Sequence, residues 1–378
     1  MIDVFEVAEL FVDWVRREAP DDIALIAYYG SYATGTATAT SDLDLFYIPD
    51  EGKENAMFAR LYRSVILQGR AFEFWPLSWE FAGRIASGQH HWSVAPSIIA
   101  HAHALYTRTE ADQQRFEALQ TQIADNQKSE NRGAMIKRAH DAFQPATHAL
   151  YRVQAAAAQA DLIDARWASA QLVDALLDTL ALVNQTFFVK NWASDITQLA
   201  HLTLQPADLA ARIEVLITTT DFAALPALAA SLTADTRAII VEQTRTIREI
   251  TDLNAVFGGY FAAVCEYANK IRTACERGNW INANVVAAQM QREWANMLAY
   301  GVDGVPYSDF NGFAEYRATA DRLGFPDLAP ALAAHDLAQL TERTCAFEQA
   351  IQTFFEQHHL ALHDAWTLDE LREIVDHG

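Results

Sequence analysis

The amino-acid sequence predicts an α+β protein in which a small domain with a mixed sheet precedes an all-α helical bundle. Within the first 77 residues, short apolar runs that end at Gly or Pro alternate with apolar residues at helical spacing. Beyond about residue 110, Ala, Leu, Gln and Glu dominate, and no convincing alternating strand follows. The chain has 378 residues, and at roughly 150 residues per domain this length predicts two or three domains.

Five elements are predicted in order within the first 77 residues. The first helical pattern stops at Pro20, because proline cannot continue a helix. The next apolar run ends at Gly30, as expected for a buried strand that enters a turn. The predicted elements are a helix over residues 7–15, strands over 23–29 and 43–48, a helix over 57–66 and a strand over 71–77.

Long helical patterns fill the remainder of the chain, over residues 167–190, 236–256, 261–277 and 337–355. Amphipathic helices must bury their apolar stripes on one another, so a helical bundle is the economical architecture. We expect a first domain over 1–110, a linker or exposed helix start over 111–132, and a helical domain over 133–378. The helical domain would form one bundle or two subdomains.

The composition is strongly acidic. Lys and Arg number 28 and Asp and Glu number 49, so the formal net charge is −21. Phosphate backbones are bound by clustered cations, so this balance disfavours nucleic acid as the main partner. The three cysteines do not pair into a framework, and no apolar run approaches the roughly 20 residues that span a bilayer. We expect a cytoplasmic protein without membrane contact, and the sequence leaves a homodimer open.

The stretch that follows the first predicted strand carries the chemistry. A Gly30-Ser31 turn can expose backbone N–H groups and a hydroxyl at a helix N-terminus, which suits phosphate oxygens. Asp42 and Asp44 flank Leu43 at the start of the next strand, so both carboxylates project to one face. Two carboxylates held close together repel each other, and a divalent metal ion is the usual remedy.

The predicted strand over 71–77 supplies a third acid, Glu73. Aromatic residues flank it, and a glutamate at the centre of a buried strand is costly unless it is paired or bound to a metal. If this strand lies beside that of Asp42 and Asp44, the three carboxylates converge. Oxygen ligands favour Mg²⁺, so the sequence predicts a magnesium site formed by these three acids.

The pattern Gly30-Ser31 followed by Ser41-Asp42-Leu43-Asp44, with a later strand acid at Glu73, resembles the nucleotidyltransferase superfamily that includes DNA polymerase β. The resemblance covers about residues 20–110. The helical remainder is similar to the layout of kanamycin nucleotidyltransferase and other antibiotic adenylyltransferases. The resemblance implies transfer of a nucleoside monophosphate, expected to be AMP, from an NTP to an acceptor hydroxyl, with release of pyrophosphate.

The same resemblance implies a role for each matching residue. Asp42 and Asp44 would bind two Mg²⁺ ions, and Glu73 would complete the site of the ion that activates the acceptor oxygen. Gly30 and Ser31 would hold the β- and γ-phosphates of the NTP. The chain departs from the family where Thr34 stands, because members often carry a basic residue there.

No motif places the carboxylate base that antibiotic-modifying relatives often add for the acceptor. Asp141 is the candidate base, four residues after Lys137 on a predicted helix, so the two side chains share a face. Lys137 would meet the α-phosphate and Asp141 the acceptor hydroxyl. The alternative interpretation is an exposed helix pair without a catalytic role.

Three functions stay open from the sequence. The first is a Mg²⁺-dependent nucleotidyltransferase that acts on a small hydroxylated molecule, which the acidic balance would allow to be a cationic, antibiotic-like acceptor. The second is a nucleotidyltransferase that acts on a protein or a tRNA, as in toxin–antitoxin systems. The third is a regulatory module that binds nucleotide through Gly30-Ser31 without transferring it.

Overall fold

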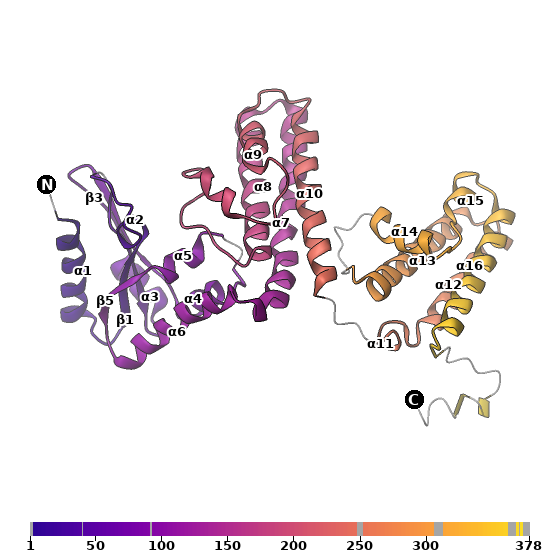
Figure 1. Cartoon of the computed structure of the whole chain (residues 1–378), viewed down its shortest axis with the longest axis horizontal. Coiled ribbons are helices and arrows are strands. Elements are labelled where there is room, and N and C mark those ends of the chain that lie inside the picture. Colours follow the sequence, from indigo (N-terminus) through magenta and orange to yellow (C-terminus); the bar gives the residue numbers. More distant parts are fainter. Residues whose placement is uncertain are drawn as a thin grey trace. The chain divides into compact units, whose positions relative to one another are not determined.

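The computed structural model describes residues 3–39, 41–90, 93–247, 252–305, 313–361, 368–369 and 371–372. The chain divides into two compact units, Met1–Gln243 and Thr244–Gly378 (Figure 1). This division does not test the domain boundaries predicted at residues 110 and 132, which remain predictions. No helix among these residues combines the length and the apolar character that crossing a membrane requires.

A five-stranded mixed sheet lies in the unit Met1–Gln243, with its strands in the order β3-β4-β2-β1-β5. β1 pairs antiparallel with β2 and with β5, and β3 pairs antiparallel with β4. β2 and β4 are parallel, so the chain must cross over between them. The strands are β1 Ile23–Tyr29, β2 Asp44–Pro49, β3 Arg63–Leu67, β4 Arg70–Pro76 and β5 His103–Thr107.

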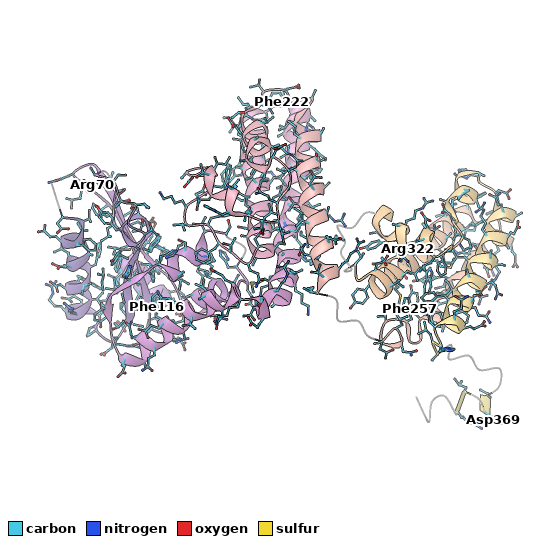
Figure 2. The ribbon with its side chains drawn as sticks, in the orientation of Figure 1. Arg70, Phe116, Phe222, Phe257, Arg322 and Asp369 are labelled. Atoms are coloured by element: carbon cyan, nitrogen blue, oxygen red, sulfur yellow. The ribbon has the colours of Figure 1, made fainter. Side chains whose placement is uncertain are left out.

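Alternate residues of these strands face two separate cores. One face packs against α1 (Val4–Glu18) and buries Leu45 and Phe74. The opposite face buries Phe46 against three helices, and Phe116 of the last of them lies in this core (Figure 2). These helices are α4 Trp79–Ala86, α5 Ala95–Ala100 and α6 Glu110–Asn126. The helices therefore cover β2 on this second face, except at its first residue, which is half-buried.

The predicted helix over 57–66 is wrong in its second half. The helix α3 is Glu54–Leu61, and the residues after it form β3, which pairs with β4. The turn between the two strands is Gln68-Gly69, whose φ angles of 52° and 80° are the left-handed values that a two-residue hairpin requires. The apolar pattern of this segment fits a helix as well as a strand, and the hairpin turn favours the strand.

The rest of this unit is helical. α7 (Arg132–Gln159) and α8 (Leu162–Val183) share a long core rich in Ala and Leu, in which α9 and α10 also take part. The other elements are α2 Gly30–Ala33, the short 3-10 helices η1 Ser129–Asn131 and η2 Ile196–His201, α9 Leu209–Thr218 and α10 Leu225–Thr246.

The unit Thr244–Gly378 has its own core, and all the regular elements among its described residues are helices. Trp294 lies at its centre, in ring contact with Phe257 (Figure 2), Phe325, Phe354 and Phe355. The helices are α11 Asn254–Phe257, α12 Tyr260–Glu276, α13 Trp280–Asp303, α14 Phe313–Arg322, α15 Ala329–Ala333 and α16 Leu337–Gln357. A small mixed sheet followed by helices confirms the predicted α+β fold class.

Candidate active site

Gly30 forms the corner where β1 ends and the single turn α2 begins. Its φ is +71°, and a Cβ atom built there would lie 2.0 Å from Oδ2 of Asp44, so only glycine fits. The Thr34 hydroxyl donates to the Gly30 carbonyl oxygen at 3.1 Å and closes the turn. Thr34, where relatives often carry a basic residue, thus holds the backbone of the turn, and Ser31 lies half-buried within it.

Asp44 is the first residue of β2 and pairs across the sheet with Tyr29, the last residue of β1. Its side chain is half-buried. Burial raises the pKa of Asp44 to about 6, and the negative charges of Asp42 and Glu73 add to this effect. The structure therefore brings the three predicted carboxylates into one electrostatic cluster, on the edge of which Gly30 lies.

The environment of Glu73 differs from the expected one. β4 lies beside β2, with Phe74 paired to Leu45, so Glu73 and Asp44 precede neighbouring positions of parallel strands. Glu73 itself is exposed, because β4 buries Phe72 and Phe74 on the α1 side and leaves the other face open at this position. Glu73 is therefore not the buried strand glutamate that the sequence predicted, and burial gives it no need of a metal.

Three residues at this cluster were not predicted from the sequence. The Trp75 indole Nε1–H donates to the Tyr29 hydroxyl at 3.0 Å. Burial raises the pKa of Tyr29, with a further contribution from Asp44, so its phenol stays protonated beside the carboxylates. The Tyr62 hydroxyl donates to Oε1 of Glu73 at 2.9 Å. The one sequence feature that pointed to these contacts was the presence of aromatic residues on both sides of the strand acid Glu73.

The loop that precedes β2 is fixed by a cation from another strand. Arg70 lies at the turn end of β4 (Figure 2) and donates to the carbonyl oxygens of Ala39 and Ser41. Ser41 immediately precedes Asp42, so this contact helps to fix the backbone position of Asp42, the first carboxylate of the cluster. Among the described side chains, Arg70 makes no ion pair with the acids of the cluster.

The donor set of the cluster suits a hard cation, since it consists of carboxylate oxygens without a paired Lys or Arg among the described side chains. In the part of the chain that the structure describes, no three His, Cys, Asp or Glu side chains form a ready-made metal cage. Mg²⁺ is usually bound through one or two carboxylates together with water and substrate phosphates, so Asp42 and Asp44 fit such an ion. The assignment of Glu73 to the metal stays a prediction.

Lys137 and Asp141 both lie exposed on α7. Both Asp141 and Arg237 act electrostatically on His140. The pKa of His140 is lowered, mainly by burial. The negative charge of Asp141 opposes this effect, and the positive charge of Arg237 adds to it. None of the contacts among described residues joins Lys137 or Asp141 to the carboxylate cluster, so their roles stay predictions.

A cavity of about 410 Å³ opens beside the loop between α2 and β2. Thr36 contributes from this loop, and the segment after α8 contributes Phe187, Lys190, Asp195 and His201. The amide of Gln198 fixes that segment, because its Oε1 accepts the backbone N–H groups of Val189 and Lys190 at 2.9 and 3.1 Å. The cavity is of the size that small ligands occupy.

Comparisons with known proteins agree with the domain that the motif predicted. The family model of the nucleotidyltransferase domain matches residues 9–76. No curated protein matches the chain. Among solved structures, a nucleotidyltransferase-like protein from Exiguobacterium sibiricum matches with 11% identity and a TM-score of 0.36, over 64% of this chain and 75% of that one. The kanamycin-type subfamily stays a prediction. Residues 9–76, which include Gly30, Asp42, Asp44 and Glu73, are thus similar to the nucleotidyltransferase domain.

Proposed function

We propose that this protein is a Mg²⁺-dependent nucleotidyltransferase, which moves a nucleoside monophosphate, expected to be AMP, from an NTP to a hydroxyl of a small acceptor. The observation that supports it most is the Asp44 carboxylate, packed against Gly30 and raised in pKa beside Asp42 and Glu73. A carboxylate whose pKa is raised by burial and by neighbouring charges is typical of a catalytic centre. The family match to residues 9–76 spans all four residues.

Each residue has a chemical task in this proposal. The backbone of Gly30 and the Ser31 hydroxyl hold the terminal phosphates of the NTP. Asp42 and Asp44, with Glu73, supply oxygen ligands for the metal. Mg²⁺ bound there would offset the phosphate charge and align the displacement. Tyr29, kept protonated by burial, adds a neutral hydroxyl beside these charges.

The transfer needs one bond formed and one broken. The acceptor oxygen forms a bond to the α-phosphorus while the bond from this phosphorus to the α–β bridging oxygen breaks, and pyrophosphate leaves. The hydroxyl proton passes to a base, for which Asp141 is the predicted residue and Lys137 its predicted phosphate-binding neighbour. The 410 Å³ cavity beside Thr36 supports a small acceptor, because it adjoins the turn that would hold the phosphates.

Pyrophosphate release tests the proposal. The full chain is incubated with each of ATP, GTP, CTP and UTP, with Mg²⁺ and with a panel of hydroxylated acceptors that includes aminoglycosides. Asp44→Asn is expected to abolish release. The control is Asp13→Asn, which removes an equally negative but exposed carboxylate from α1 and should leave the rate unchanged.

The other functions give different results in the same assay. NTP binding without turnover on any small acceptor, protein or tRNA would favour a regulatory module. Transfer to tRNA or to protein alone would move the acceptor class to a macromolecule. Full release of pyrophosphate by Asp44→Asn would overturn the assignment of the metal site.

A further inference from the structure

A second cavity lies in the unit Thr244–Gly378, outside the nucleotidyltransferase domain, and its interpretation does not depend on the proposed reaction. Its volume is about 430 Å³, which is within the range of small-molecule sites. α13 supplies most of its polar surface and α12 begins at its wall. The lining includes Val256, Tyr260, Glu293, Asn296, Met297 and Tyr300.

Glu293 is the charged group of this cavity. Its carboxylate accepts hydrogen bonds from the hydroxyls of Tyr260 at 3.2 Å and Tyr267 at 2.9 Å, and from the amide of Gln289 at 2.7 Å. All three donors are neutral. Among the described side chains, no Lys, Arg or His forms an ion pair with Glu293. These three bonds hold the half-buried carboxylate in place, and no described side chain supplies it with a counter-ion.

Asn296, on the same face of α13, adds a buried oxygen that lacks a hydrogen-bond donor among the described residues. It lies three residues after Glu293, so the two side chains are neighbours on the helix surface. Asn296 is 6% exposed, and its Oδ1 has no hydrogen-bond partner in the part of the chain that the structure describes. Buried polar atoms are normally satisfied, and an exception at a cavity wall points to a ligand that brings the donor.

The remaining lining is aromatic or apolar. The ring of Tyr260 stacks on Trp294 with centroids 6.1 Å apart, which holds the phenol rigidly at the wall. On the same helix, Met297 lies one turn and Tyr300 two turns beyond Glu293. Aromatic faces beside a carboxylate attract cations through the ring quadrupole, and the sulfur and aliphatic groups suit a carbon skeleton.

We infer that this cavity binds a small organic cation, an ammonium or guanidinium group carried on an apolar or aromatic body. The charged nitrogen donates to Glu293, which supplies the missing counter-ion, and Asn296 turns its buried Oδ1 toward the cavity to accept a second N–H of the ligand. The body of the ligand packs against Tyr260, Tyr300 and Met297. A neutral ligand of the same shape would leave the Glu293 charge unpaired.

Aromatic probes of similar size, two cationic and one neutral, test this inference. Binding of 2-phenylethylammonium and of benzylguanidinium to the full chain is measured by titration calorimetry, beside neutral 2-phenylethanol. Both cations are expected to bind at least tenfold more tightly than the alcohol. Glu293→Gln, which keeps one carbonyl oxygen to accept from both tyrosine hydroxyls, should weaken both cations at least tenfold and leave the alcohol unchanged. Glu276→Gln, at an exposed position near the end of α12, is the matched control and should change nothing.

Asn296→Leu gives a second, independent readout. Removal of a buried oxygen without a partner should raise the melting temperature of this unit, while cation affinity falls. This variant keeps the inference testable if Glu293→Gln fails to fold. Equal affinity for cation and alcohol, full cation affinity in Glu293→Gln, or no cation binding by the native chain at millimolar concentration would each overturn the inference.

Discussion

Gly30 is under two separate constraints, a left-handed backbone and the closeness of Asp44. Its φ of +71° disfavours a side chain, and an added Cβ would lie 2.0 Å from Oδ2 of Asp44. We therefore expect Gly30→Ala to lower the free energy of unfolding by roughly 1–3 kcal/mol. We also expect it to abolish pyrophosphate release, because the carboxylate must move.

Gly35 provides the control for this substitution. It has the same φ of +71° and nothing within 4 Å of its Cβ position, so Gly35→Ala carries the backbone strain without the clash. The two variants are compared by urea denaturation and by pyrophosphate release. An equal loss of activity in both would show that backbone strain, and not displacement of Asp44, is responsible.

Asp44 predicts a pH dependence that can be measured without any substrate. Its pKa of about 6 in the folded chain is above the ordinary value of 3.8, so the folded state holds this proton more tightly than the unfolded state. Its contribution to stability is therefore complete below about pH 4 and is lost as the pH rises to about 6. In the metal-free protein, Asp44→Asn should be more stable than the native chain above pH 6, by about 1–2 kcal/mol after allowance for solvent screening.

Denaturation of both chains in a chelator across this pH range checks the prediction. The advantage of Asp44→Asn should grow between about pH 4 and pH 6 and then stay level. Asp13→Asn, which removes an exposed carboxylate of α1, should show no such growth. A native chain that gains stability relative to Asp44→Asn as the pH rises would contradict the cause given for the raised pKa.

At the scale of the element, local patterns in the sequence were sufficient for part of the site. Gly30, Asp42 and Asp44 follow from a strand, a turn and the alternation of side chains, which are all local rules. The contact of Tyr29 with Trp75 depends on β2 lying between β1 and β4, and this order joins residues 46 positions apart. The hairpin of β3 was missed because its apolar residues also fit a helix, and only the left-handed pair Gln68-Gly69 separates the two.

The link between the sheet and the helical part of the same unit is also non-local, and it rests on a buried acid. The Ser93 backbone N–H donates to Asp178 of α8, and the Phe188 N–H donates to the Ser93 carbonyl oxygen at 2.9 Å. The amide of Gln185 adds a bond to the carbonyl of Asn126 at 3.0 Å. These contacts position the segment after α8 and hence the cavity beside Thr36.

The buried carboxyl group of Asp178 predicts that the stability of this unit depends on pH. It is 8% exposed, and burial raises its pKa to about 8. The folded state thus holds the proton more tightly, and the stability that this group contributes is lost as the pH rises from about 4 to about 8. Asp178→Asn keeps an oxygen for the Ser93 amide and cannot ionise, so its advantage over the native chain should grow up to pH 8.

Asp178→Leu separates charge from hydrogen bonding at this position. It leaves the Ser93 N–H without its acceptor, so its free energy of unfolding should be lower than that of Asp178→Asn at every pH, by roughly 1–3 kcal/mol. Thermal denaturation of the three chains at a series of pH values makes the comparison. Parallel pH profiles for the native chain and Asp178→Asn would show that Asp178 is not the buried titrating group.

At the scale of the whole molecule, the hydrophobic cores follow the division of the chain. Three clusters of buried apolar residues lie before residue 244, two of them on the faces of the sheet and one between α7, α8, α9 and α10. The cluster around Trp294 lies wholly within Thr244–Gly378. No cluster of described buried residues includes members of both units. Since cooperative unfolding follows a shared core, each unit is expected to unfold as its own cooperative body.

A matched pair of core truncations tests this independence. Leu177 of α8 and Leu340 of α16 are both 0% exposed, one in each unit. Each Leu→Ala change should remove roughly 2–5 kcal/mol of stability from the unit that contains it. Calorimetry of the native chain should show two transitions. Leu177→Ala should lower one of them by several degrees and Leu340→Ala the other, at about 2–4 °C for each kcal/mol. A single transition that both substitutions lower equally would show that the units unfold together, and the cation site of the second unit would then also depend on the stability of the first.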